Sequence, residues 1–290
     1  MAIVLTVSAG GASASSKQLT PYGGLGTWLD IYAGKAAWRH PGREVAAMAR
    51  HGVRTLYLET GNYRQAVVLM RPWAQGRFID DAHAAGIRVV AWYLPSFEGL
   101  QQDQRRALAA IRFRSPKGER FDGFALDIEA TTVRAIPLRN QRLLQLSARL
   151  RAAVGPGYPL GAITPSPIGM SPSYWPGIPY RALARIYDVF LPMAYSTDAG
   201  IQGPTATLAY LSATVRAIRG RAGDPDLPIH LIGGLSREMG PSETAGFVRA
   251  VADCAPLGYS LYSFPSTRRV TWQALGARRR ARAVAASSCT

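Results

Sequence analysis

The sequence predicts an α/β fold, a single (β/α)8 barrel of the TIM type. Short apolar runs with strand character alternate with amphipathic, helix-like stretches eight times along the 290 residues. Such alternation is typical of a parallel sheet with helical crossovers, and eight units in about 250 residues match the usual size of this barrel. No G-x-G-x-x-G turn of an open, doubly wound sheet follows the first strand, and no linker divides the chain. One barrel is therefore expected over residues 26–276.

The expected strands are runs rich in Val, Ile, Leu, Tyr and Trp, which suit a pleated, buried surface. In chain order they are residues 27–33, 54–60, 88–94, 121–129, 159–164, 188–195, 229–235 and 259–264. The helices expected between them are amphipathic, and the first two end at Gly52 and Gly86, which suit the cap of a helix C-terminus. In chain order they are residues 41–51, 72–85, 101–113, 138–154, 180–186, 205–219, 241–252 and 271–284.

Residues 121–130, FDGFALDIEA, contain the fourth expected strand and its most unusual side chains. Alternation along a strand places Asp127 and Glu129 on one face, with Phe124, Leu126 and Ile128 on the other. The two acids would lie about 6–7 Å apart, and neighbouring carboxylates raise each other's proton affinity. At the open end of a barrel such a pair suits the cleavage of a glycosidic bond. The alternative is a buried structural network in which both acids pair with arginines or backbone amides.

The carboxyl ends of the other expected strands add acids and aromatic side chains, and catalytic groups of this fold gather at these ends. Acids among Trp and Tyr indicate a carbohydrate site, because sugar rings stack on aromatic faces while their hydroxyls bond to carboxylates. No cofactor is expected, and a metal site is disfavoured because His230, near the start of its strand, is the only histidine in such a run. For the acids Asp30 and Glu59, a structural role is the alternative. The expected substrate-binding residues are Asp30, Tyr32, Glu59, Trp92, Tyr93, Met193 and Tyr262.

The stretch FDGFALDIEA resembles the strand-four signature of family 18 glycoside hydrolases, the chitinase-like barrels, which reads D-G-x-D-x-D-x-E. Asp122, Gly123, Asp127 and Glu129 match, whereas Ala125 replaces the first inner aspartate. The resemblance implies that Glu129 is the general acid that protonates the leaving oxygen. It also implies that Asp127 orients a 2-acetamido group of the substrate, which itself attacks the anomeric carbon. Asp122 is expected at the opposite end of the barrel, outside the site.

A second motif lies on the sixth expected strand, where Met193-Ala194-Tyr195 is similar to the M-x-Y-D of the same family. The resemblance implies that Tyr195 helps to hold the reacting sugar; a core tyrosine with a bonded hydroxyl is the alternative. Ser196 replaces the aspartate that ends the family motif. This departure and Ala125 leave open a related barrel glycosidase that acts on another sugar. The second carboxylate would then be Asp127, Glu59 or Asp30.

The function expected from these residues is hydrolysis of a polysaccharide or oligosaccharide with retention of configuration, with Glu129 as general acid/base and Asp127 as the supporting carboxylate. One alternative is a non-catalytic carbohydrate-binding barrel, although Glu129, the residue usually lost in such proteins, is present. Another is a barrel enzyme that acts on a phosphorylated sugar. It rests on Gly233-Gly234 and Arg268-Arg269, which are similar to the phosphate site common in these barrels.

The chain carries 34 basic and 18 acidic residues, a net charge of +16. This charge predicts attraction to an anionic partner, such as a polymer of the cell envelope. The alternative is a compositional preference for arginine, spread over solvated helix faces. The one dense cluster is Arg278-Arg279-Arg280 with Arg282, in a basic tail expected over residues 277–290. No nucleic-acid-binding motif accompanies it, so nucleic acid is not an expected partner.

Residues 1–25 are expected to be a leader or the remnant of a signal peptide. A short apolar run precedes Ala12-Ser13-Ala14, which resembles a signal cleavage site. No apolar run reaches the roughly 18 residues that a membrane span needs, and the protein is expected to be secreted or held in the cell envelope. Cys254 and Cys289 are the only cysteines; one disulfide and two free thiols are both open.

Overall fold

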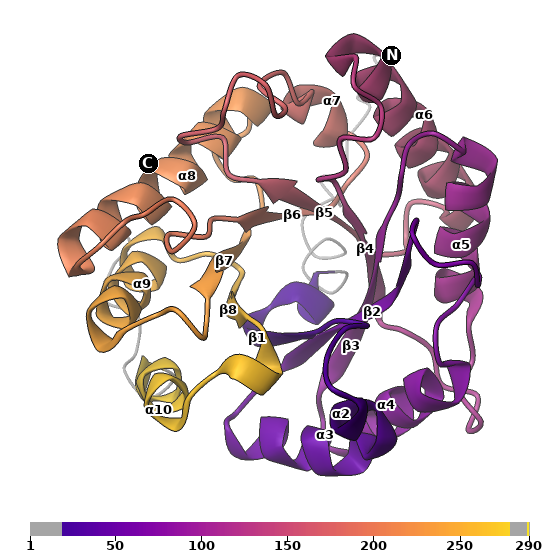
Figure 1. Cartoon of the computed structure of the whole chain (residues 1–290), viewed down its shortest axis with the longest axis horizontal. Helices are drawn as coiled ribbons and strands as arrows, with labels where there is room; N and C mark the ends of the chain where they lie inside the picture. The colour runs from indigo at the N-terminus through magenta and orange to yellow at the C-terminus, as the bar shows by residue number, and fades with distance from the viewer. Residues whose placement is uncertain (1–18, 279–288, 290) are drawn as a thin grey trace, which may run out of the picture.

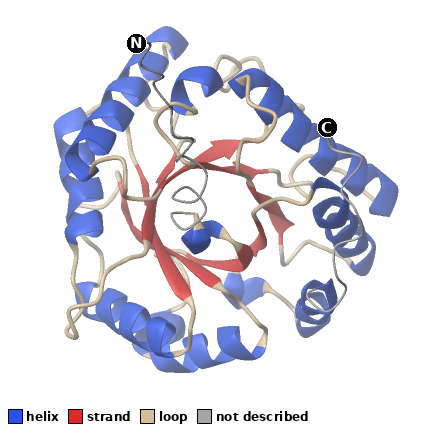
Figure 2. Ribbon diagram, turned by 180° about the vertical axis from the view of Figure 1, so that it is seen from behind, coloured by secondary structure: helices blue, strands red, loops and turns tan. Residues whose placement is uncertain are grey.

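The computed structural model describes residues 19–278 and residue 289, and it contains a closed barrel of eight parallel strands in the order β1 to β8. Figure 1 shows the barrel end-on, with the strands as an inner ring and the helices around it. Figure 2 shows the same ring from behind. The single (β/α)8 barrel predicted from the sequence is confirmed.

Each expected strand is present, and most of their ends lie within a few residues of the prediction. The first strand starts and ends earlier than expected, because residues 30–33 leave the sheet in a turn closed by the Ala33 N–H and the Asp30 carbonyl (3.2 Å). An apolar run suits either conformation, so alternation alone does not locate this boundary. The strands are β1 (Gly24–Leu29), β2 (Thr55–Asn62), β3 (Arg88–Leu94), β4 (Gly123–Asp127), β5 (Leu160–Pro165), β6 (Val189–Met193), β7 (His230–Leu235) and β8 (Gly258–Tyr262).

The expected helices are also present, and Gly52 and Gly86 have the positive φ values, 77° and 71°, of residues that end a helix. The helices are α3 (Pro41–Arg50), α4 (Pro72–Ala84), α5 (Leu100–Arg112), α6 (Ile136–Val154), α7 (Tyr180–Leu183), α8 (Pro204–Ala222), α9 (Pro241–Cys254) and α10 (Arg269–Arg278). The sequence did not indicate the short helix α2 (Lys35–Arg39) or the 3₁₀ turns η1 (Thr20–Tyr22) and η2 (Phe264–Ser266).

The apolar core has two parts, separated by the wall of the barrel. The larger part lies between strands and helices, and the smaller fills the barrel, with Tyr22, Trp28 and Trp92 among its members. Tyr22 comes from η1, the indigo turn inside the ring in Figure 1, and its hydroxyl donates to the Phe124 carbonyl at 2.8 Å. Residues 19–25, which the sequence assigned to a leader, are therefore part of the barrel. Residues 1–18 lie outside the described residues.

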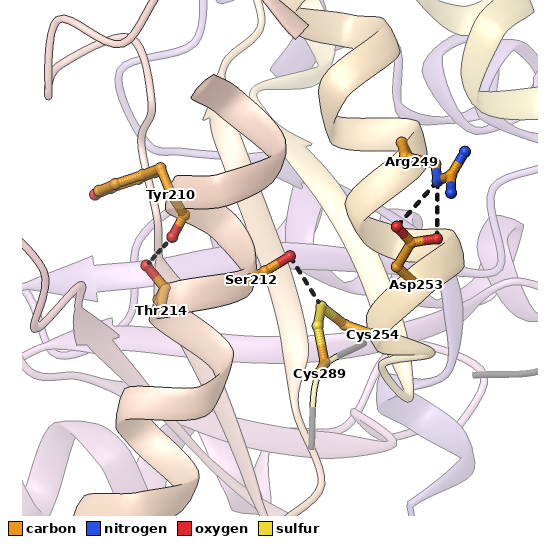
Figure 3. Close-up of a disulfide and its surroundings, with 7 residues drawn as sticks. All are labelled: Tyr210, Ser212, Thr214, Arg249, Asp253, Cys254 and Cys289. Carbon is orange, nitrogen blue, oxygen red and sulfur yellow. Dashed lines mark hydrogen bonds and ion pairs between the residues drawn. A yellow bond between two sulfur atoms is a disulfide. The ribbon is translucent and has the colours of Figure 1, made fainter. Parts of the chain in front are cut away.

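A disulfide joins Cys254, the last residue of α9, to Cys289, and Figure 3 shows its surroundings. Ser212 of α8 lies beside it, with 3.5 Å between its Oγ and the Cys254 Sγ. Of the two alternatives for the cysteines, the structure has the disulfide. Apart from Cys289, the side chains of the expected basic tail, with its arginine cluster, lie outside the described residues. Within residues 19–278, no helix has both the length and the apolar character needed to cross a membrane.

Candidate active site

A cavity of about 250 Å³ lies at the mouth of the barrel, where the strands have their carboxyl ends. This mouth cavity contains all of the predicted site residues except Asp30 and Tyr93. The residues that line it are Tyr32, Glu59, Asn62, Arg64, Trp92, Leu94, Asp127, Glu129, Met193, Tyr195 and Tyr262.

Asp127 is the last residue of β4, and only 5% of its surface is exposed. Its Oδ1 has no hydrogen-bond partner among residues 19–278 and 289. Burial, followed by the charges of Glu129 and Glu59, raises the pKa of Asp127 well above its ordinary value. A buried carboxyl oxygen without a partner is costly to keep, so this atom is available to hydrogen-bond with a ligand in the mouth cavity.

Glu129 lies in the loop after β4, two residues beyond Asp127. Burial raises its pKa, and the guanidinium of Arg64 opposes this effect. Its backbone is held by Tyr174, whose hydroxyl donates to the Glu129 carbonyl at 3.0 Å. Because the pKa values of both acids are raised, the pair retains a proton at a pH where an exposed carboxyl group has lost it.

Glu59 on β2 is a third carboxyl group of the mouth cavity, and like Asp127 it is buried. Its Oε2 accepts the Ile31 N–H at 2.9 Å, and its Oε1 accepts a hydrogen bond from Asn62 Nδ2 at 3.1 Å. Burial raises the pKa of Glu59 to about 7, although these two hydrogen bonds act in the opposite direction. Asn62 also donates to the hydroxyl of Tyr32 at 3.0 Å, so Glu59 is rigidly placed and linked to the rim of the cavity.

Asp30 does not line the mouth cavity, but it is bonded to two residues that do. Its Oδ2 accepts the hydroxyl of Tyr262 at 2.5 Å, and its Oδ1 accepts the N–H of Tyr32 at 2.8 Å. Both tyrosines line the mouth cavity. Both oxygens of Asp30 are thus already used to hold two wall residues, and Asp30 itself does not line the mouth cavity.

Trp92 and Tyr93 were both expected in the site, but neighbouring residues of a strand point to opposite faces. Trp92 points into the barrel and lines the mouth cavity, and its Nε1 has no hydrogen-bond partner in the described part of the chain. Tyr93 points outward, where its hydroxyl donates to Asp103 Oδ1 at 2.7 Å on helix α5. The assignment of Tyr93 to the site is wrong, and Trp92 offers the cavity a buried donor.

Tyr195 follows β6 and stands at the mouth cavity together with Met193. Its ring centroid lies 6.3 Å from that of Tyr262. Burial, with the nearby charges of Asp127 and Glu129, raises the pKa of Tyr195 well above its ordinary value, so its hydroxyl stays protonated. The cavity therefore has aromatic walls on several strands and a phenolic donor close to the acids.

The structure explains both departures from the family 18 pattern by packing. Ala125 is buried inside the barrel opposite Gly161, where a Cβ on Gly161 would lie 2.9 Å from the ring of Tyr22 and 3.3 Å from the Ala125 Cβ. The side chain of Tyr22 fills the barrel at this level and leaves no room for an aspartate at position 125. Ser196 is buried against β7, and its Oγ donates to the Gly233 carbonyl at 3.1 Å.

The residues that suggested a phosphate site serve packing instead. A Cβ on Gly233 would lie 2.3 Å from the ring of Phe247, and one on Gly234 would lie 2.8 Å from the Met239 sulfur. These distances require glycine so that α9 and its loop can approach β7. Arg268 donates to the Met239 carbonyl at 2.6 Å. None of these residues lines the mouth cavity.

Sequence reasoning missed Asn62 and Arg64. It ended the second strand at residue 60, whereas β2 continues to Asn62 through a register shift between Glu59 and Gly61. A glycine after an apolar run suggests a turn, which hid the extension. The polar pair Asn62 and Arg64, directly after the acid Glu59, is the signal that could have found it. No cluster of three or more possible metal-ligating side chains occurs among residues 19–278 and 289.

A second cavity of about 280 Å³ adjoins the mouth cavity, and Glu129, Met193 and Tyr195 line both. Its other walls come from the loops after β5 and β6 and from α8. They are Pro165, Ser166, Ile168, Gly169, Met170, Tyr174, Asp198, Ala199 and Tyr210. Glu129 thus stands at the junction of two cavities, which leaves room on both sides of this acid.

No protein-family model and no curated protein matches the chain at the level of sequence. Solved structures match in fold. The spore cortex-lytic enzyme SleL of Bacillus cereus has a TM-score of 0.63 at 9% identity, over 92% of this chain and 76% of that one.

Two further structures with the same fold are named as a chitinase and a mannanase. The chitinase of Chromobacterium violaceum has a TM-score of 0.56 at 13% identity, over 87% of this chain and 98% of that one. The endo-1,4-beta-D-mannanase of Thermotoga petrophila has a TM-score of 0.62 at 10% identity, over 83% and 88%. At these identities the likeness establishes that the chain shares their barrel fold.

Proposed function

We propose that this protein is a glycoside hydrolase that cleaves a polysaccharide or an oligosaccharide, with Glu129 as general acid/base and Asp127 as the supporting carboxylate. The observation that carries the proposal is this pair of acids with raised pKa values at the mouth cavity, of which the buried Asp127 keeps an oxygen without a partner among the described residues. Acids retained only for structure pair with cations or amides. These two face a cavity with Trp92 and Tyr195 in its walls, a setting that suits a sugar.

In the proposed reaction the pair of Asp127 and Glu129 shares one proton, because burial raises the pKa of both acids, and this proton starts on Glu129. Glu129 donates this proton to the glycosidic oxygen while the bond from that oxygen to the anomeric carbon breaks. The negative charge of Asp127, next to it, stabilises the positive charge that develops on the sugar ring. Glu129, now a carboxylate, then takes a proton from the water that releases the sugar, and the enzyme returns to its starting state.

Retention of configuration requires a first nucleophile, and the proposal contains two candidates. An N-acetylated sugar would use its own acetamido group, oriented by Asp127 and Tyr195. For any other sugar the second carboxylate would be Glu59, which is held in place by the Ile31 amide and by Asn62. A thiazoline inhibitor, which mimics the product of acetamido attack, is expected to bind only in the first case.

The structural neighbours support the reaction class, since their names describe a cortex-lytic enzyme, a chitinase and a mannanase. We further propose that the protein is secreted or held in the cell envelope. The Cys254–Cys289 disulfide supports this location, because disulfides persist in oxidising compartments and are rare in the cytosol.

The central experiment is hydrolysis of a panel of neutral, N-acetylated and acidic glycans by the wild type and by Glu129→Gln. We expect the substitution to lower the rate on the cleaved glycan by roughly 10²–10⁴-fold without lowering the melting temperature. Glu119→Gln is the matched control, because Glu119 is an exposed acid that pairs with His83 away from the cavity. A full rate for Glu129→Gln would remove it as the acid. Binding of a glycan by the wild type without turnover would instead favour a carbohydrate-binding barrel.

A further inference from the structure

A cavity of the outer barrel wall lies away from the mouth, beside the short helix α7. It has a volume of about 590 Å³, and we call it the arginine cavity. Its walls come from the end of the loop after β5, from α7 with the residues just after it, and from the C-terminal part of α8. The residues that line it are Pro176, Ile178, Pro179, Tyr180, Arg181, Ala182, Arg185 and Arg221.

Three of the residues that line the arginine cavity are arginines, and none is an acid. Arg181, Arg185 and Arg221 are all exposed. No ion pair joins any of them to a carboxylate within the described residues. The cavity therefore concentrates three positive charges that no part of the described fold neutralises.

Nearby arginines show what a structural role looks like in this region. Arg151 on α6 pairs with Asp188 at 2.7 Å and donates to three backbone carbonyls. Arg139, also on α6, is buried and donates to the Val133 carbonyl at 2.7 Å. In the arginine cavity, by contrast, Arg221 only stands over the ring of Tyr180, with 5.9 Å to its centroid. Its guanidinium makes no hydrogen bond to the described residues, so its donors are available to a ligand.

The rest of the wall is rigid and apolar. Pro176 and Pro179 restrict the backbone, and the buried Tyr180 is fixed by its hydroxyl, which donates to the Pro165 carbonyl at 3.2 Å. Trp175, which directly precedes Pro176, is buried, and its Nε1 donates a hydrogen bond to Asn140 Oδ1 at 2.7 Å. A rigid apolar wall is pre-organised, so the wall itself loses little conformational entropy when a ligand binds.

The same loop also reaches the candidate active site. Tyr174 lines the second cavity beside Glu129, and Pro176, two residues later, lines the arginine cavity. The loop between them is anchored by Arg139, which donates to the Tyr174 carbonyl at 2.8 Å and stands 4.6 Å from the ring of Trp175. One anchored loop therefore borders both cavities.

We propose that the arginine cavity binds the carboxylate groups of an acidic polysaccharide and holds that polymer next to the catalytic cleft. Guanidinium groups bind carboxylates through two parallel hydrogen bonds, and the apolar wall accepts the faces of the sugar rings. The net charge of +16 attracts such a polymer from a distance. The link to catalysis rests on the proposed function, whereas the binding of the polymer does not.

The test is affinity electrophoresis of the full chain through gels that contain polygalacturonate, with the neutral glucan pullulan as the comparison polymer. The variant is Arg181→Gln, Arg185→Gln and Arg221→Gln combined. Its control changes three other exposed arginines, and it has the same net charge. The control positions are Arg54, Arg105 and Arg112.

We expect polygalacturonate to retard the wild type and the control equally, and the cavity variant at least tenfold less, while pullulan retards none of them differentially. An equal loss in both triple variants would show an effect of net charge alone and would overturn the proposal. Tighter binding of polyphosphate or of single-stranded DNA through the same three arginines would overturn the choice of a carboxylate polymer. If the triple variant does not fold, Arg185→Gln alone, compared with Arg105→Gln, gives the same comparison with a smaller difference.

One further measurement in the same gels tests this inference separately from the proposed function. Glu129→Gln is expected to bind polygalacturonate as the wild type does, because Glu129 does not line the arginine cavity. If no glycan is hydrolysed and the arginine-dependent retardation persists, the proposed function fails and the arginine cavity stands. If glycans are hydrolysed but the retardation does not depend on the three arginines, the arginine cavity fails alone.

Discussion

Strand β4 has an aspartate at each end, and the two aspartates have opposite surroundings. Asp122, just before the strand, is bonded by His83 (2.9 Å), by Arg88 (3.1 Å) and by the Val89 N–H (2.8 Å). Asp127, the last residue of the strand, has an oxygen without a partner in the described residues. Burial acts to raise the pKa of both, but at Asp122 the hydrogen bonds outweigh it and the pKa is lowered.

The contrast extends to the other strands. The amino-terminal ends of the strands form the end of the barrel opposite the mouth, which we call the closed end. There Asp188 pairs with Arg151 at 2.7 Å and accepts the Leu160 N–H at 2.8 Å. At the mouth, Glu59 has an amide and Asn62 as partners, but no ion pair within the described part of the chain. The closed end thus neutralises its acids and gains stability from them, whereas the mouth keeps acids that destabilise the fold and are available for chemistry.

The largest effect that tests this contrast is expected from Asp127→Asn. An asparagine cannot support positive charge on the sugar, so we expect the rate of glycan hydrolysis to fall by roughly 100-fold. The same change removes a buried, unpartnered charge, so the melting temperature should rise, by about 2–4 °C for each kcal/mol regained. Kinetics and thermal unfolding of one preparation measure both effects.

The opposite signs of these two effects are what distinguish Asp127 from a structural acid. A variant that loses both activity and stability would show that Asp127 holds the fold together. A pH profile of the rate that stays unchanged would show that Asp127 and Glu129 do not titrate as a coupled pair.

Much of this contrast could be predicted from the sequence, because alternation along FDGFALDIEA places both acids on the inner face and at the end of one strand. Packing decides what alternation cannot. Trp92 and Tyr93 are adjacent aromatics, and only one can face the cavity. Asp30 follows the first strand at the right end, but its oxygens are used by Tyr262 and Tyr32; Tyr262 lies on β8, 232 residues away, and alternation does not reveal such a partner.

The boundaries of the barrel were also beyond the sequence pattern. Tyr22 lies in a stretch that resembles the end of a leader, yet it fills the barrel and its hydroxyl contacts Phe124, 102 residues away. Asn62 was hidden because the register shift next to Gly61 depends on pairing with β3. Long-range contacts of this kind cannot be recognised in the local sequence pattern. The same pattern does show which segments are strands and at which end of its strand a side chain lies.

A second, smaller effect is expected from the pH dependence of stability. Burial raises the pKa of Glu59 from about 4.5 to about 7, so between these values the folded protein holds a proton that the unfolded chain has released. The free energy of unfolding therefore falls as pH rises through this range, by about 3 kcal/mol at most. Glu59→Gln is expected to flatten this decline, so that it is more stable than the wild type at pH 8 and similar to it at pH 4.

Chemical denaturation of the wild type and Glu59→Gln across this pH range checks the prediction. The matched control is Glu119→Gln, which makes the same change of side chain at an exposed position outside the mouth cavity. If the free energy of unfolding depends on pH in the same way for Glu59→Gln and the wild type, the hydrogen bonds of Glu59 offset the cost of its burial, as they do for the acids of the closed end.

The smallest effect is expected at the closed end of β4, from Asp122→Asn. Here the lowered pKa means that Asp122 stabilises the fold above its unfolded pKa, and this stabilisation is lost as pH falls. An asparagine can still accept the Val89 N–H, but it loses the charge that pairs with His83 and Arg88, so we expect a loss of about 1–2 kcal/mol at pH 7. The rate of hydrolysis should not change, because Asp122 does not line the mouth cavity. Urea unfolding and kinetics, measured beside Asp127→Asn, give opposite results if the two ends differ as described. A large loss of rate in Asp122→Asn would mean that the two ends of this strand are not separate in function.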